Sequence, residues 1–157
     1  MTYYATEKGI RNLEKEITNL TKKSRELESK TQETAQICGD GWHDNPGLYA
    51  LTDEADMRAK HINELFSVVN NCQRITYPKT VMNICIGSRV VIEDNERTEN
   101  YEIVGYGESD PDNGKILYDT PLARWLIGKK VNDIFIMKIA GEQRKIKVLR
   151  IDPLSSS

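Results

Sequence analysis

The chain has 157 residues, of which 38% are hydrophobic and 29% are charged, and its formal net charge is -2. This composition is too apolar for a disordered protein, and the length suffices for two small units. The near-neutral charge argues against an autonomous nucleic-acid binder, which usually carries a basic face. Because no apolar run approaches the roughly 18 residues of a membrane span and no signal-peptide pattern opens the chain, we expect a cytoplasmic protein without a membrane partner.

Two long segments repeat apolar or small residues at the a and d spacing of a coiled coil. They cover residues 10–38 and 48–72, and neither has an interior Gly or Pro. A short break rich in Gly and Pro joins them, so the two helices should be antiparallel neighbours. The pattern therefore predicts a coiled-coil hairpin over residues 1–75, with a first helix roughly 50 Å long at about 1.5 Å per residue.

The seam of this predicted arm changes character along its length. Near the base it consists of Ile, Leu and Val, whereas towards the break it becomes polar or small, with Ser24, Thr31, Thr34, Ala55 and Arg58. A polar seam buries less apolar surface, so the distal half of the arm should be the less stable half. We interpret the length of the arm as reach rather than as a source of stability.

The break carries the acids that are most informative for function. It reads GDGWHDNPG over residues 39–47, which places Asp40 and Asp44 in a loop at the tip of the arm. Lys and Arg are absent between Lys30 and Arg58, while six acidic residues fall in that window. Two Asp side chains are too few for a stand-alone Mg²⁺ site, but they suit the completion of a site that already holds one metal.

The second half of the chain has a different pattern. A Tyr-Pro pair stops the second helix and predicts a linker at residues 76–79. Within residues 80–157, Thr120, Pro121 and Gly128 are suitable caps for a short helix of about two turns. Strand-like runs occupy residues 81–91, 101–104, 115–118, 133–139 and 144–151. The predicted fold is α+β, an N-terminal antiparallel coiled-coil hairpin followed by a small antiparallel sheet domain with one short helix.

With these elements in this order, the chain resembles the Gre family of bacterial transcript cleavage factors. The resemblance covers almost the whole chain, and its strongest piece is YEIVGYGESDPDNGKILYDTPLARWLIGKKVNDIF, over residues 101–135. It implies that residues 80–157 adopt an FKBP-like fold and dock on bacterial RNA polymerase at the rim of the secondary channel, while the coiled coil enters the channel. The docking residues that the resemblance implies are Asp110, Pro121 and Arg124.

The resemblance also implies a reaction. In Gre factors, acids at the tip reach the polymerase active centre, help to hold a second Mg²⁺ and orient the water that cleaves backtracked RNA near its 3′ end. Asp40 and Asp44 would be the catalytic and metal-holding residues, in a Mg²⁺ site shared with polymerase. The chain would then be a monomeric accessory factor that stimulates the RNA cleavage activity of polymerase and is not itself an enzyme.

The tip departs from the family pattern, in which Gly-Asp is followed by two residues and then by Glu-Asn-Ala. Here three residues separate Asp40 from Asp44, and the second acid is Asp where the family prefers Glu. Trp42 either packs across the helix ends or stacks on a base, and His43 is either a solvated loop residue or a ligand or general base. The candidate contacts to nucleic acid or polymerase in the tip are Trp42, His43, Asn45 and Tyr49.

Two other functions stay open at this point. Relatives of Gre factors enter the same channel and inhibit or retune polymerase without stimulating cleavage, and an altered tip is where they differ. Alternatively, the second half of the chain is a prolyl isomerase or peptide-binding module with the hairpin as a chaperone arm. The sequence favours this last hypothesis least, because several aromatic residues of this half fall at positions that should fill its core.

Overall fold

The computed structural model describes residues 2–38, 46–139 and 141–154. The chain divides into an arm unit, residues 11–72, and a sheet unit, residues 1–10 together with 73–157. The heptad pattern predicts a hairpin over residues 1–75, whereas the structure groups the first ten residues with the sheet. The reason is a set of backbone hydrogen bonds: Ile75 N donates to Ala5 O at 2.9 Å and Tyr106 N donates to Tyr4 O at 2.9 Å.

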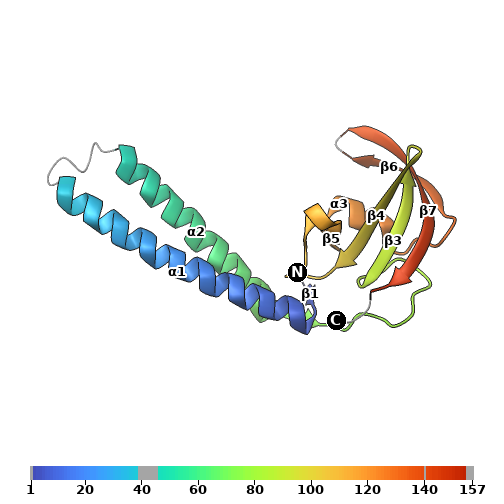
Figure 1. The fold of residues 1–157 in the computed structure, drawn as a ribbon, viewed down its shortest axis with the longest axis horizontal. Coiled ribbons are helices and arrows are strands. Elements are labelled where there is room, and N and C mark those ends of the chain that lie inside the picture. The colour runs from blue at the N-terminus through green and yellow to red at the C-terminus, as the bar shows by residue number, and fades with distance from the viewer. Residues whose placement is uncertain (1, 39–45, 140, 155–157) are drawn as a thin grey trace. The chain divides into compact units, whose positions relative to one another are not determined.

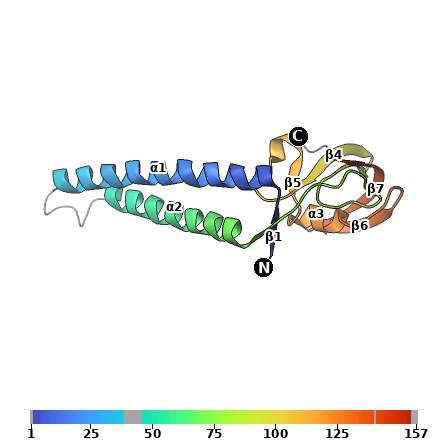
Figure 2. The ribbon, with the colours of Figure 1, turned by 90° about the horizontal axis from the view of Figure 1, so that it is seen from below.

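The arm unit is the predicted helical hairpin. Helix α1 spans Glu7–Cys38 and helix α2 spans Pro46–Asn71, and the two lie side by side in two perpendicular views (Figures 1 and 2). Arg58 of α2 donates from Nη1 to the backbone carbonyl of Lys23 on α1, at 3.1 Å. None of the helices in the described residues combines the length and the apolarity that crossing a membrane requires.

The heptad seam lies where the sequence predicts it. On α1 the buried hydrophobic residues are Ile10, Leu13, Ile17 and Leu27. On α2 the seam positions whose burial is described are intermediate in exposure, and Val68, one residue away from the predicted seam, is buried. Distally, Thr31 Oγ1 donates to Leu27 O at 2.9 Å and Thr34 Oγ1 donates to Lys30 O at 2.8 Å. These hydroxyls bond within their own helix, so they add no hydrogen bond between α1 and α2.

The sheet unit contains a five-stranded sheet in the order β5-β4-β3-β7-β6. The strands are β3 (Ser88–Asp94), β4 (Arg97–Val104), β5 (Lys115–Leu117), β6 (Ile134–Ile139) and β7 (Glu142–Pro153). Neighbours pair antiparallel except β5, which runs parallel to β4 with Glu102 opposite Lys115. The predicted antiparallel sheet is therefore mixed, because the loop after β4 and the 3-10 helix η2 (Pro111–Asn113) return the chain to the same end of the sheet.

Three further elements differ from the sequence prediction. Strand β3 begins at Ser88 and not near residue 81, because Ser88 Oγ holds a turn by donating to Cys85 O at 2.7 Å and accepting from Cys85 N. Strands β3 and β4 are joined by Asn95 and Glu96, with φ of 47° and 71°, as a two-residue hairpin requires. The third difference is a two-stranded sheet of β1 (Tyr3–Ala5) and β2 (Cys72–Arg74), which are too short to give a periodic signal.

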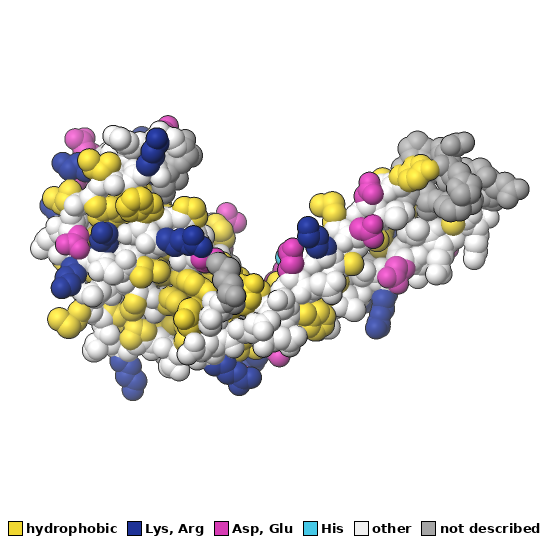
Figure 3. All heavy atoms as spheres, turned by 180° about the vertical axis from the view of Figure 1, so that it is seen from behind, with side chains coloured by type: hydrophobic (Ala, Val, Ile, Leu, Met, Phe, Trp, Pro, Cys, Tyr) yellow, Lys and Arg dark blue, Asp and Glu magenta, His cyan; other side chains and the backbone are white. Residues whose placement is uncertain are grey.

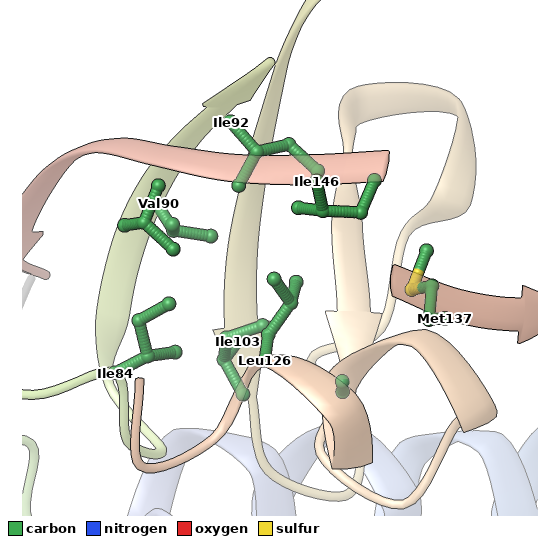
Figure 4. Packing of buried hydrophobic residues seen from close by; sticks show 9 residues of the cluster. Ile84, Val90, Ile92, Ile103, Leu126, Met137 and Ile146 are labelled. Atoms are coloured by element: carbon green, nitrogen blue, oxygen red, sulfur yellow. The ribbon is translucent and has the colours of Figure 1, made fainter. Parts of the chain in front are cut away.

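The predicted short helix is present as α3, Pro121–Leu126, and it completes the core. Thr120 caps its first turn, accepting from Ala123 N at 3.3 Å, and Gly128 follows with φ of 87°. Figure 4 shows buried side chains of α3 and the sheet facing one another. The core residues are Ile84, Val90, Ile92, Ile103, Ala123, Leu126, Met137, Ile146 and Val148.

Candidate functional site

The predicted tip acids, Asp40 and Asp44, lie in residues 39–45, outside the described residues. The same holds for the candidate contacts Trp42, His43 and Asn45. The helices on either side of this segment are described, since α1 ends at Cys38 and α2 begins at Pro46. A proline suits that first helical position, because the N–H it lacks would have no partner within the helix.

The described part of the distal arm is acidic. Its exposed acids are Glu33, Asp53, Glu54 and Asp56, and Figure 3 shows Asp and Glu side chains along the arm. Arg58, the first basic residue after Lys30, is engaged by Glu54, with Nη2 at 2.6 Å from Oε1. This surface would repel a nucleic-acid backbone and attract divalent cations.

Exposed apolar side chains accompany these acids. Tyr49, the one candidate tip contact within the described residues, is 58% exposed on α2. Ile37 and Met57 are 85% and 74% exposed, and the sequence prediction missed both. Both lie off the heptad seam, in positions where a solvated coiled coil carries polar residues, and that mismatch was the available signal. Large apolar groups left in solvent beside the tip are typical of a contact surface.

The described residues contain no group of three His, Cys, Asp or Glu side chains able to hold a metal ion. Asp40 and Asp44 lie outside that set, and their donor chemistry fits Mg²⁺, which prefers carboxylate oxygens. Two carboxylates leave most of the roughly six coordination positions of Mg²⁺ to other ligands. Asp40 and Asp44 alone would therefore leave a Mg²⁺ ion incompletely coordinated.

Two of the three predicted docking residues have architectural roles. Asp110 exchanges two backbone hydrogen bonds with Lys115, both at 2.9 Å, and its Oδ2 accepts from Asn113 Nδ2 at 2.7 Å. Pro121 is the first residue of α3. Arg124 is different, because its side chain is 59% exposed and is held by Asp119, with Nε at 2.9 Å from Oδ1. Arg124 is therefore the docking candidate that the fold itself does not require.

A partly buried hydrogen-bond network in the sheet unit was not predicted. Glu108 Oε2 accepts from Thr6 Oγ1 and from the Tyr77 hydroxyl, each at 2.6 Å. The Tyr77 hydroxyl in turn accepts from Gly105 N at 3.2 Å. Burial, and secondly the hydrogen bond to Glu108, raise the pKa of Tyr77 well above its ordinary value. The sequence shows Tyr77 only as part of a helix stop, so this long-range role left no signal.

Close packing and aromatic contacts surround this network. A Cβ on Gly9 would lie 2.2 Å from Tyr106 O, so only glycine fits at this place in the first turns of α1. The rings of Tyr3 and Tyr106 meet edge to face with centroids 5.1 Å apart, as do those of Tyr4 and Tyr118 at 5.6 Å. The N-terminal residues are thus held in the sheet unit by both packing and hydrogen bonds.

Comparisons with known proteins identify the family of this chain. Residues 79–153 match the family model for the C-terminal part of the transcription elongation factors GreA/GreB. Over 153 residues, 95% of this chain and 96% of the relative, the sequence is 31% identical to transcription elongation factor GreA of Shouchella clausii. This chain belongs to the GreA/GreB family of transcription elongation factors.

Other relatives of this Gre-family chain cover it to a similar extent. Transcription elongation factor GreA of Clostridium kluyveri is 31% identical over 152 residues, 95% of each chain. Among solved structures, GreA factor homolog 1 of Thermus thermophilus is 21% identical and covers 96% of this chain and 99% of its own, with a TM-score of 0.47. The sequence relatives extend over the arm unit as well as the sheet unit, so family membership is not confined to the C-terminal part.

Proposed function

We propose that this elongation factor inserts its arm into the secondary channel of bacterial RNA polymerase and stimulates cleavage of backtracked RNA. One observation carries the proposal. The two helices of a long arm flank Asp40 and Asp44, and between Lys30 and Arg58 the arm has acidic residues but no Lys or Arg, while Arg58 itself is paired with Glu54. Polymerase would provide the catalytic centre and the 3′ end of the nascent RNA. The factor would act as a cytoplasmic monomer and an accessory protein.

Within this proposal, Asp40 and Asp44 would hold a Mg²⁺ shared with polymerase, and that ion would supply Lewis acidity and an activated water. The chain would thus add two carboxylates to a site that polymerase provides. Exposed acids such as Asp53 add negative potential along the arm, which favours approach of the cation. The exposed rings and aliphatic groups near the tip, Tyr49, Ile37 and Met57, would contact the channel wall.

The proposal is tested in a stalled, backtracked complex made with bacterial RNA polymerase. Asp40→Asn and Asp44→Asn remove the charge but keep the size of each side chain, so we expect RNA cleavage to fall by at least about 100-fold. Polymerase affinity, measured by competition with labelled wild-type protein, should stay within about twofold because the tip residues do not create the docking surface.

Asp53→Asn is the matched control, because Asp53 is an exposed acid of the same arm but lies outside the tip. Because it removes only a distant contribution to the negative potential, it should change the cleavage rate by no more than about twofold. Wild-type cleavage in both tip variants would contradict the assignment of Asp40 and Asp44.

A second candidate function is a secondary-channel regulator that inhibits or retunes polymerase without stimulating cleavage. The observation that favours it is the tip sequence, in which Asp44 stands one residue later and one methylene shorter than the family glutamate. The same experiment separates the two functions. If the wild-type protein slows nucleotide addition and leaves backtracked RNA intact, the second function replaces the first.

A further inference from the structure

Strand β6 forms one edge of the five-stranded sheet, and it pairs only with β7 among the described residues. Its side chains alternate, with Phe135 and Met137 packed against the core. On the opposite face, Ile134 and Ile136 are 57% and 62% exposed. An edge strand that shows large aliphatic groups to solvent is a template for pairing with another chain.

The charged side chains beside these isoleucines on strands β6 and β7 are lysines. Lys138 follows on the same face of β6, while Lys147 and Lys145 of β7 stand opposite Ile134 and Ile136. None of the three lysines forms an ion pair with a described residue. By contrast, three arginines of this sheet form ion pairs: Arg89 with Glu102, Arg144 with Asp94, and Arg150 with Asp152.

An acid also lies beside this surface, because Glu93 of β3 stands directly opposite Lys147, on the side of β7 away from β6. Ile134, Lys145 and Lys147 line a shallow hollow whose other wall is formed by Glu93, Asn95 and Glu96. Figure 3 shows hydrophobic side chains lying among Lys and Arg on one face of the sheet unit. The β6 edge, defined here as Ile134, Ile136, Lys138, Lys145 and Lys147, therefore combines a free backbone edge, two exposed isoleucines and three unpaired positive charges.

We propose that the β6 edge binds an extended segment of a partner protein by strand addition, and that this segment carries carboxylates flanking β-branched apolar residues. Backbone groups of β6 would supply hydrogen bonds, the isoleucines would contact the apolar side chains, and the lysines would pair with the carboxylates. This surface is on the sheet unit and does not depend on the function proposed for the tip.

The lysines decide the chemistry of the occupant. A second copy of the chain, pairing β6 with β6, would gather six of these lysines on one face of the joined sheets, and this accumulation of like charge disfavours pairing. Lysines on an edge strand also discourage non-specific association. A strand that carries carboxylates would be attracted by the lysines. The same residues would therefore disfavour basic strands and favour acidic ones.

The test uses the full chain and a synthetic peptide, Thr-Glu-Thr-Val-Thr-Val-Thr-Glu-Thr, which places Glu and Val on one face in either orientation. We expect amide NMR shifts concentrated in residues 134–139 and an affinity that weakens as salt is added. A peptide with Lys in place of Glu should bind at least about 10-fold more weakly. A peptide N-methylated along its β6-facing edge should not bind, because it cannot complete the strand hydrogen bonds.

Matched charge-reversal variants test whether the lysines of the β6 edge bind the acidic peptide. Lys145→Glu combined with Lys147→Glu should weaken binding of the acidic peptide by at least about 10-fold. Lys22→Glu combined with Lys23→Glu makes the same charge change on exposed residues of α1 and should leave binding unchanged. Equal binding of the acidic and basic peptides, equal binding of the N-methylated peptide, or shifts outside β6 and β7 would overturn the proposal. Self-association abolished by Ile136→Lys would overturn it in favour of a second copy.

Discussion

At the scale of single residues, the Tyr77 hydroxyl links separate segments of the sheet unit. It donates to Glu108 and accepts from Gly105 N, while Glu108 also accepts from Thr6. Through these bonds one carboxylate joins the N-terminal residues, the segment after α2 and the loop after β4. The three segments are far apart in sequence, so local patterns could not reveal the network.

We expect Tyr77→Phe to destabilise the sheet unit by about 1–3 kcal/mol, because it removes the hydroxyl and leaves the buried Gly105 N–H without its acceptor. Urea unfolding monitored by fluorescence would measure the loss. Glu108→Gln is the informative comparison, since its amide oxygen can still accept from Tyr77 and Thr6. A smaller loss for Glu108→Gln is expected, and a Tyr77→Phe protein as stable as wild type would show that the network contributes nothing net.

At the scale of elements, the distal seam of the arm has polar or small residues where the seam near the base has large apolar ones. Thr31 occupies a seam position, yet its hydroxyl bonds to Leu27 O within α1. Thr31→Leu should therefore add apolar contact between the helices without removing any bond between them, and stabilise the arm by about 1 kcal/mol. Amide hydrogen exchange in the distal halves of α1 and α2 should slow accordingly.

Thr18→Leu provides the control for this change. Thr18 makes the same type of hydrogen bond, from Oγ1 to Glu14 O at 2.8 Å, but it is exposed and lies off the seam. Its replacement should leave exchange in the distal arm unchanged. If both variants slow exchange equally, the effect belongs to helix propensity and not to the seam.

The long helices were predictable because heptad periodicity continues over many residues, and the short helix α3 because Thr120, Pro121 and Gly128 mark its ends. Strand β5 was predictable as a strand, but its parallel pairing was not, since pairing direction depends on the path of the preceding loop. The start of β3 was misplaced because residues 81–87 are as apolar as a strand but form turns. Apolar composition alone does not distinguish a strand from an apolar segment that forms turns.

The candidate site was predictable to a different degree. Its acids could be identified from the break in periodicity between the helices and from the family resemblance, and their roles stay predictions because they fall in residues 39–45. The exposed residues Ile37 and Met57 carried a signal that heptad positions reveal, namely apolar side chains on a polar face. The β6 edge carried none, because only strand order shows which strand of a sheet is free on one side.

At the scale of the whole molecule, the two units should respond differently to alkali. Tyrosines with a raised pKa, Tyr77, Tyr101, Tyr106 and Tyr118, all belong to the sheet unit, and burial is the main cause for each. The folded unit therefore retains phenol protons that the unfolded chain releases above a pKa of about 10. This contribution to stability is fully present below that pH and declines as the pH rises further.

The measurement compares urea unfolding at about pH 8 and about pH 11. Trp42→Phe leaves Trp125 as the fluorescence reporter of the sheet unit, while helical circular dichroism follows the arm unit. Alkali should lower the unfolding midpoint of the sheet unit more than that of the arm unit, and Tyr77→Phe should reduce the difference. A parallel decrease in both units, unaffected by Tyr77→Phe, would mean that other titrating groups dominate.

The regular heptads of α1 and α2 also restrict how such a protein can change in size. Removing seven residues from each helix would leave every a and d position matched and would move the tip by about 10 Å. A deletion whose length is not a multiple of seven, or a deletion from one helix alone, would turn apolar residues towards solvent or leave seam positions unmatched. If the seam is to stay matched, the length of the arm can therefore change only in steps of about 10 Å that are taken from both helices together.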